Sequence, residues 1–171
     1  MMTAMARPQP AAAVVERNEP LRKVYLETLS LIERLHRQLL DVIKDELDRR
    51  DEREINSVQA LLLFNVGDQE LTAGELRTRG HYLGSNVSYN LKKLVEMGFL
   101  DHQRSRIDRR SVRIKLTDKG RDVRDTVETL YQKHVRTVEQ VGGISSEEFS
   151  TLNKSLHRLE RFWTDQILYR L

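Results

Sequence analysis

Apolar residues recur at helical spacing over most of the chain, and the spacing changes once, after Gly98. Over residues 19–50 they lie three or four positions apart, which predicts one long amphipathic helix. A shorter segment, 55–67, is apolar nearly all round and is expected to form a buried central helix. Two more helices, starting near Thr117 and Ser145, carry an apolar stripe towards the C-terminus.

The segment 71–97 is expected to hold two consecutive helices. Thr72 followed by Glu75 is the sequence of a capping box and marks the start of the first. The second, expected over residues 84–97, has an apolar side that can anchor it to a core and a polar side. The polar side consists of Ser85, Tyr89, Lys92, Lys93 and Glu96, flanked by Asn86 and Ser88, with Asn90 nearer its edge.

After Gly98 the apolar period changes to two, which is typical of β-strands. Val112, Ile114 and Leu116 alternate with polar residues, a partner strand precedes them, and the connection around residues 105–109 is basic. Two helices followed by a basic-tipped hairpin predict a winged helix-turn-helix, and therefore a mainly α fold with a small β-hairpin wing (α+β). An ordinary α+β segment with a solvated charged loop is the alternative.

This segment resembles the DNA-binding core of the MarR family of bacterial transcription regulators. The run Asp108-Arg109-Arg110-Ser111, followed by Leu116-Thr117 and Gly120, is similar to the wing signature of that family. The resemblance extends, in pattern, over about residues 20–170. It implies a single domain over 19–171, with a winged helix-turn-helix lobe at 55–121 and long dimerisation helices at 19–50 and 117–171.

The polar side of the second helix suits the major groove of DNA, which presents hydrogen-bonding groups on its base edges. Lys92 and Lys93 are expected to contact phosphates or guanine edges, and the backbone near Ser85 can donate to a phosphate. Bases are expected to be contacted by Asn86, Ser88, Tyr89 and Asn90.

On the wing, the family resemblance implies that Arg110 enters a minor groove and that Asp108 steadies it. A guanidinium suits the negative potential of a narrow A·T-rich groove. Between residues 68 and 121 there are 12 Lys and Arg against 7 Asp and Glu, whereas the rest of the chain has 17 against 19. The positive excess therefore lies where phosphates would be neutralised. The wing residues expected to contact phosphates are Arg104, Arg106, Arg109 and Arg113.

Composition excludes several other classes. The chain of 171 residues is 39% apolar and 32% charged, which is typical of a soluble protein with a modest core. It has no cysteine, so disulfides and thiolate chemistry are excluded. The histidines lack metal-ligand spacing, so we expect no metal; a zinc site built from distant helices is the alternative. No phosphate-binding glycine loop or nucleophile elbow indicates catalysis, so we predict neither an enzyme nor a cofactor.

Residues 1–18 are rich in Ala and Pro and predict a disordered lead-in with a helical start near Ala11. Their apolar run is too short for a signal peptide or a membrane span. A cytoplasmic protein without membrane contact is therefore expected.

The apolar stripe of the last helix includes Trp163 and Ile167 and continues to Leu171. A stripe of this kind would stay in water in a monomer, which predicts a homodimer; helices that close a monomeric core are the alternative. The family resemblance also implies a cleft for a small aromatic or amphipathic effector, and an interface without a ligand is an equal alternative. The cleft would be lined by Leu29, Ile32, His36, Leu62, Tyr131 and His134.

We therefore predict a homodimeric regulator that binds a pseudo-palindromic site in double-stranded DNA and represses transcription, although the resemblance also permits activation. The alternative from another class is a winged-helix protein-interaction module without sequence-specific DNA binding. The two differ in salt dependence, because neutralising phosphates releases counterions.

Overall fold

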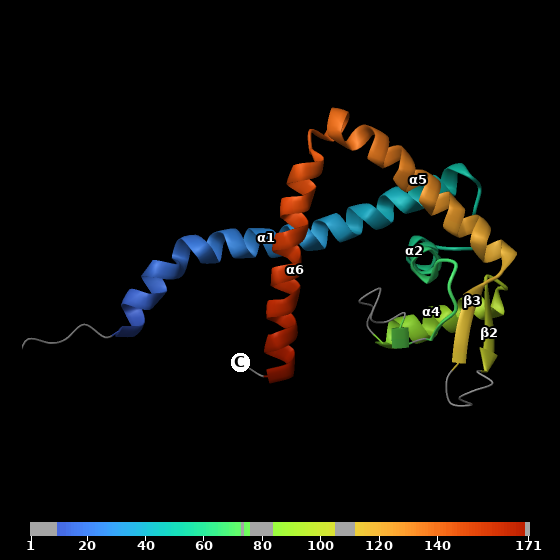
Figure 1. Ribbon diagram of the computed structural model, residues 1–171, viewed down its shortest axis with the longest axis horizontal. Coiled ribbons are helices and arrows are strands. Elements are labelled where there is room, and N and C mark those ends of the chain that lie inside the picture. Colours follow the sequence, from blue (N-terminus) through green and yellow to red (C-terminus); the bar gives the residue numbers. More distant parts are fainter. Residues whose placement is uncertain (1–9, 73, 76–83, 105–111, 170–171) are drawn as a thin grey trace, which may run out of the picture. The chain divides into compact units, whose positions relative to one another are not determined.

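The computed structural model describes residues 10–72, 74–75, 84–104 and 112–169, and only the backbone of residues 10–18, 84–87, 103–104 and 112 (Figure 1). Its helices are α1 (Pro10–Arg49), α2 (Ser57–Val66), α4 (Gly84–Glu96), α5 (Asp118–Gly142) and α6 (Ser146–Tyr169). Its strands are β1 (Leu71–Thr72), β2 (Leu100–Arg104) and β3 (Val112–Leu116). This mostly helical fold with a small sheet confirms the predicted fold class.

The chain divides into two compact units, residues 1–53 and 54–171. The first unit contains α1, which begins at Pro10, beside the helical start expected near Ala11 and ahead of the long helix expected over residues 19–50. Part of the expected disordered lead-in is therefore helical. Ile43 and Leu47 are buried, and the buried carboxylate of Glu46 accepts a hydrogen bond from Arg50 Nε at 3.0 Å. The single domain expected over 19–171 stays a prediction.

Helix α2 is the buried central helix of the second unit, as its apolar sequence predicted. Asn56 caps it: its side chain accepts from the Gln59 backbone N at 2.9 Å, and the Gln59 side chain accepts from the Asn56 backbone N at 3.2 Å. The helix ends at Gly67, whose φ of 62° favours glycine. α2 packs against α5. The buried apolar side chains of these two helices are Ala60, Leu62, Leu63, Val66, Val123, Val127 and Leu130.

The sheet is antiparallel in the order β1-β3-β2, so β3 is central. Figure 1 shows β2 and β3 side by side, with α4 next to them. β1 was not predicted, because two residues are too few to show alternation; Leu71 pairs with Ile114. Thr72 also makes the predicted capping box: its Oγ1 accepts from Glu75 N at 3.1 Å, and the Glu75 carboxylate accepts from Thr72 N at 2.6 Å.

Helix α5 begins at a junction that we define as residues 97–99 and 117–120. The Thr117 hydroxyl donates to the Gly98 carbonyl at 2.7 Å and accepts from Gly120 N at 3.1 Å. The Lys119 ammonium lies 4.3 Å from the centre of the Phe99 ring and donates to the Met97 carbonyl at 3.3 Å. The junction therefore joins the end of α4, the start of β2 and the start of α5.

Helix α6 begins with a capping box, at the helix start predicted near Ser145. The backbone N of Ser145 donates to the Glu148 carboxylate at 2.8 Å, and Glu148 N donates to the Ser145 hydroxyl at 3.2 Å. The hydrogen bonds from the Ser145 backbone and then from its side chain lower the pKa of the Glu148 carboxyl, because they favour its charged form. No residue of α6 is buried among those described. Its exposed large hydrophobic side chains are Leu152, Leu156, Phe162, Trp163, Ile167, Leu168 and Tyr169.

The junction leaves no room for a side chain at position 120. A Cβ added to Gly120 would lie 2.1 Å from the Phe99 carbonyl oxygen, a backbone atom. We expect Gly120→Ala to lower the free energy of unfolding by about 1–3 kcal/mol or more, because α5 must shift off β2. Urea unfolding followed by circular dichroism measures this.

The matched control is Gly142→Ala on the same helix. Its Cβ would lie 3.4 Å from Val138 Cγ2, an ordinary contact. Because alanine is the better helix former, this variant should gain up to about 1 kcal/mol. A Gly120→Ala protein as stable as wild type would show that the junction can shift without lowering the free energy of unfolding, and would contradict the prediction.

Candidate nucleic-acid interface

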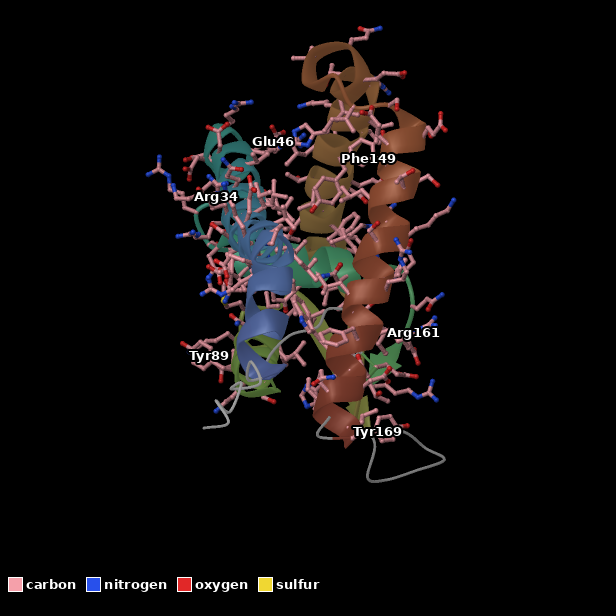
Figure 2. All side chains as sticks on the ribbon, turned by 90° about the vertical axis from the view of Figure 1, so that its left-hand side faces the viewer. Arg34, Glu46, Tyr89, Phe149, Arg161 and Tyr169 are labelled. Atoms are coloured by element: carbon pink, nitrogen blue, oxygen red, sulfur yellow. The ribbon has the colours of Figure 1, made fainter. Side chains whose placement is uncertain are left out.

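Helix α4 is anchored on one side and exposed on the other, as its pattern predicted. Leu91 and Leu94 are buried, Leu94 completely, and the helix packs against β2. On the other side the Tyr89 residue is 63% exposed and the Lys92 side chain is 78% exposed. Figure 2 shows the Tyr89 ring projecting outward from α4. Burial of the leucines thus fixes which side chains a partner can reach.

The basic residues of α4 share one acidic neighbour. Glu96 lies 3.9 Å from the Lys92 ammonium and 3.3 Å from that of Lys93. All three side chains are substantially exposed, so these ion pairs contribute little to stability and can be exchanged for contacts with phosphate. The lysines can therefore serve an anionic partner.

The other predicted residues of this helix are placed as follows. Ser88 is exposed and Asn90 is half-buried. Ser85 and Asn86 lie in the first turn of α4, where the structure describes the backbone alone. The predicted group therefore occupies one helix, with Ser88 beside Tyr89 on its exposed part.

The wing is described only in its strands. Arg104 ends β2 and pairs with Val112 of β3. Arg113 is exposed on β3, and its guanidinium lies 3.9 Å from the Glu70 carboxylate. The predicted wing residues that lie outside the described residues are Arg106, Asp108, Arg109 and Arg110.

A crevice that the sequence did not predict lies between α4 and the sheet. It has a volume of about 470 Å³. Its apolar lining comes from Leu91, Val95 and Ile114, and its polar lining from Ser88, Lys92, Glu96 and His102. The signal that could have revealed it is His102, a polar residue two positions after Leu100 and therefore on the same face of the predicted strand.

The residues predicted for an effector cleft come from both units. Leu29 and Ile32 are half-buried and His36 is exposed on α1. In the second unit, Leu62 is buried in the core and His134 is exposed. The Tyr131 ring meets Phe64 edge-on, with centroids 4.9 Å apart. The cleft stays a prediction.

The described part of the chain holds neither a metal cluster nor a membrane-spanning helix. No three histidine or acidic side chains gather there in the way that a metal ion requires. Among the same residues, no helix has both the length and the apolar character needed to cross a lipid bilayer.

The comparisons with known proteins agree with one another in the kind of relative that they find. Residues 55–120 match a family model described as a winged helix DNA-binding domain. The exopolysaccharide II synthesis transcriptional activator ExpG of Rhizobium meliloti (strain 1021) is 34% identical over 145 residues, which cover 85% of this chain and 74% of ExpG. The crystal structure of the transcriptional regulator SlyA has a TM-score of 0.69 at 21% identity and covers 84% of this chain and 99% of SlyA.

A mutant of MarR from E. coli, complexed with operator DNA, has a TM-score of 0.62 at 21% identity and covers 76% of this chain and 91% of that chain. The fold and the exposed face of α4 define a winged-helix protein of the regulator class. The chain belongs to the MarR family of winged helix, DNA-binding transcriptional regulators. The predicted family is confirmed, and it is a family of regulators rather than of enzymes.

The two sides of α4 should differ sharply in their effect on stability. We expect Leu94→Ala to lower the free energy of unfolding by about 2–5 kcal/mol, because it removes a fully buried side chain. Tyr89→Ala should change it by less than about 0.5 kcal/mol, because the ring lies mostly in water. Urea unfolding of both variants tests this, and a large loss in Tyr89→Ala would mean that the ring packs inside the protein.

Proposed function

We propose that the protein is a homodimer that binds a pseudo-palindromic site in double-stranded DNA, with α4 in the major groove and the wing in the adjacent minor groove. The observation that carries this is the exposed Tyr89 and Lys92 on a helix whose leucines are buried, in a chain of the MarR family. The similar fold of a MarR protein complexed with operator DNA supports the same use of this helix.

Within this proposal the polar side of α4 contacts bases and phosphates. Lys92 and Lys93 contact phosphates or guanine edges, and Arg110 enters the minor groove with Asp108 beside it. The base contacts come from Asn86, Ser88, Tyr89 and Asn90, with Ser85 at a phosphate. The remaining wing contacts to phosphate come from Arg104, Arg106, Arg109 and Arg113.

The exposed apolar residues of the long helices support a dimer. Trp163, Phe162 and Ile167 of α6 are exposed, and so are Leu21 and Leu35 of α1. Large apolar side chains in such numbers are typical of surfaces that another chain covers. A two-fold dimer presents two α4 helices to half-sites that lie about one turn of DNA apart.

Repression is the direct consequence of a dimer that covers a promoter, and it is the action we propose first. The similarity to ExpG, which is called an activator, supports activation as a second action at sites beside a promoter. An effector bound in the predicted cleft would shift DNA affinity by its preference for one dimer conformation. The expected place of action is the cytoplasm, together with the DNA.

Selection of bound sequences from random double-stranded DNA tests the proposal. Wild type should recover inverted half-sites centred about 10 base pairs apart. Tyr89→Ala should lose information within the half-sites, whereas Arg110→Ala should lose mainly the preference for flanking A·T pairs. Arg136→Ala, which removes an exposed arginine of α5, is the control and should recover the wild-type motif.

An unchanged motif in both test variants would assign base recognition to other residues. A single half-site without an inverted copy would argue for a monomer on DNA.

Salt dependence separates DNA binding from the alternative, a winged-helix module that contacts a protein. With six to ten phosphate contacts, affinity for DNA should fall by about 10³–10⁵ between 50 and 200 mM salt. An apolar protein interface would respond far less. Fluorescence anisotropy on the selected sequence measures the slope, and a flat response would favour the protein-interaction module.

A further inference from the structure

We propose that the crevice between α4 and the sheet receives the sugar–phosphate backbone of bound DNA, and that His102 contacts a phosphate there when its imidazole is protonated. The inference rests on the proposed function and adds a binding residue to it. Ser88 and Lys92 line the crevice from α4, and His102 lines it from β2.

The shape of duplex DNA supports this occupant. The major groove, about 12 Å wide, and the minor groove, about 6 Å wide, are separated by a phosphate backbone. A protein with a helix in one groove and a β-wing in the next must therefore straddle that backbone. In this chain α4 and the wing strands β2 and β3 supply the walls of the crevice, whose volume is about 470 Å³.

The face of the sheet that carries the buried side chain of Leu100 changes from apolar to polar at His102. Leu100 pairs with Leu116 and His102 pairs with Ile114, so these four side chains share one face of the sheet. Leu100, Leu116 and Ile114 are buried, whereas His102 is exposed. His102 therefore stands where the apolar inner face of the sheet opens into the crevice.

One basic and one acidic side chain line the crevice beside His102. From α4, Lys92 and Glu96 line the same crevice, and from β3 the residue opposite is the apolar Ile114. Lys92 lies 3.9 Å from Glu96, a weak exposed pair. Glu96 also lies 3.3 Å from Lys93.

The sign of the pH dependence follows from these contacts. Histidine changes charge between about pH 5 and 8. A phosphate favours the imidazolium over the neutral ring, so binding DNA takes up a proton at His102. Affinity for DNA therefore rises as the pH falls from about 8 to about 6.

The experiment measures affinity for the selected DNA site by fluorescence anisotropy. Each protein is measured at about pH 8 and at about pH 6, and at two salt concentrations. The proteins are wild type, His102→Gln, and the control His157→Gln, which changes an exposed histidine on α6. Wild type and the control should bind about fivefold more tightly at the lower pH through this contact, the size expected of a charge-assisted hydrogen bond. His102→Gln should lose this gain and match wild type at the higher pH.

The salt slope gives a second measurement that a structural role would not change. At the lower pH, His102→Gln should reduce it by about 0.9 for each phosphate that the imidazolium no longer neutralises, and at the higher pH it should leave the slope unchanged. An equal pH gain in wild type and His102→Gln would overturn the inference, and so would a loss of affinity that is the same at both pH values. Absence of sequence-specific binding by wild type would instead overturn the proposed function.

Discussion

The close approach of α5 to the start of β2 is the constraint on which the DNA-binding lobe depends. The approach brings Gly120 against the Phe99 carbonyl, and the Thr117 hydroxyl holds it through the Gly98 carbonyl at 2.7 Å. A second clamp lies further along the helix, where Arg124 donates to both carboxylate oxygens of Asp68 at 2.8 and 3.1 Å. Since Gly98 lies two residues after the end of α4, fixing α5 also fixes the helix proposed to contact DNA.

Because one side of α4 is buried against the sheet, its other side is exposed in a fixed orientation. At 100° per residue, a helix with Leu91 and Leu94 against a sheet turns Tyr89 away from the sheet and leaves Lys92 on the flank that borders the crevice. Helix geometry alone therefore exposes the polar side chains. The arrangement costs little stability, because the exposed residues make few packing contacts and the buried ones are ordinary leucines. The side chains proposed to contact bases can therefore change without disturbing the fold.

The sequence predicted the elements whose signals are local. The capping box at Thr72 appears where Glu75, three positions on, predicted it, and α6 begins at the helix start predicted near Ser145. The period change at Gly98 likewise predicted the hairpin. Helix α1 begins at Pro10, beside the helical start expected near Ala11, but its continuity with the helix expected from residue 19 was missed, because an Ala- and Pro-rich segment carries no amphipathic period. The strand β1 was missed because its pairing with β3 is set by tertiary structure, not by its two residues.

The candidate site was predictable on the helix and not in the crevice, for a physical reason. A helix face is encoded by spacing within one segment, so Ser88, Tyr89 and Lys92 could be grouped from the sequence alone. The crevice is built from three elements, and His102 joins it only through the register that pairs it with Ile114. That register is fixed by Leu100 and Leu116 in the core. The residues that stabilise the sheet therefore also decide which polar side chain faces α4, and the fold of the wing and its chemistry are specified together.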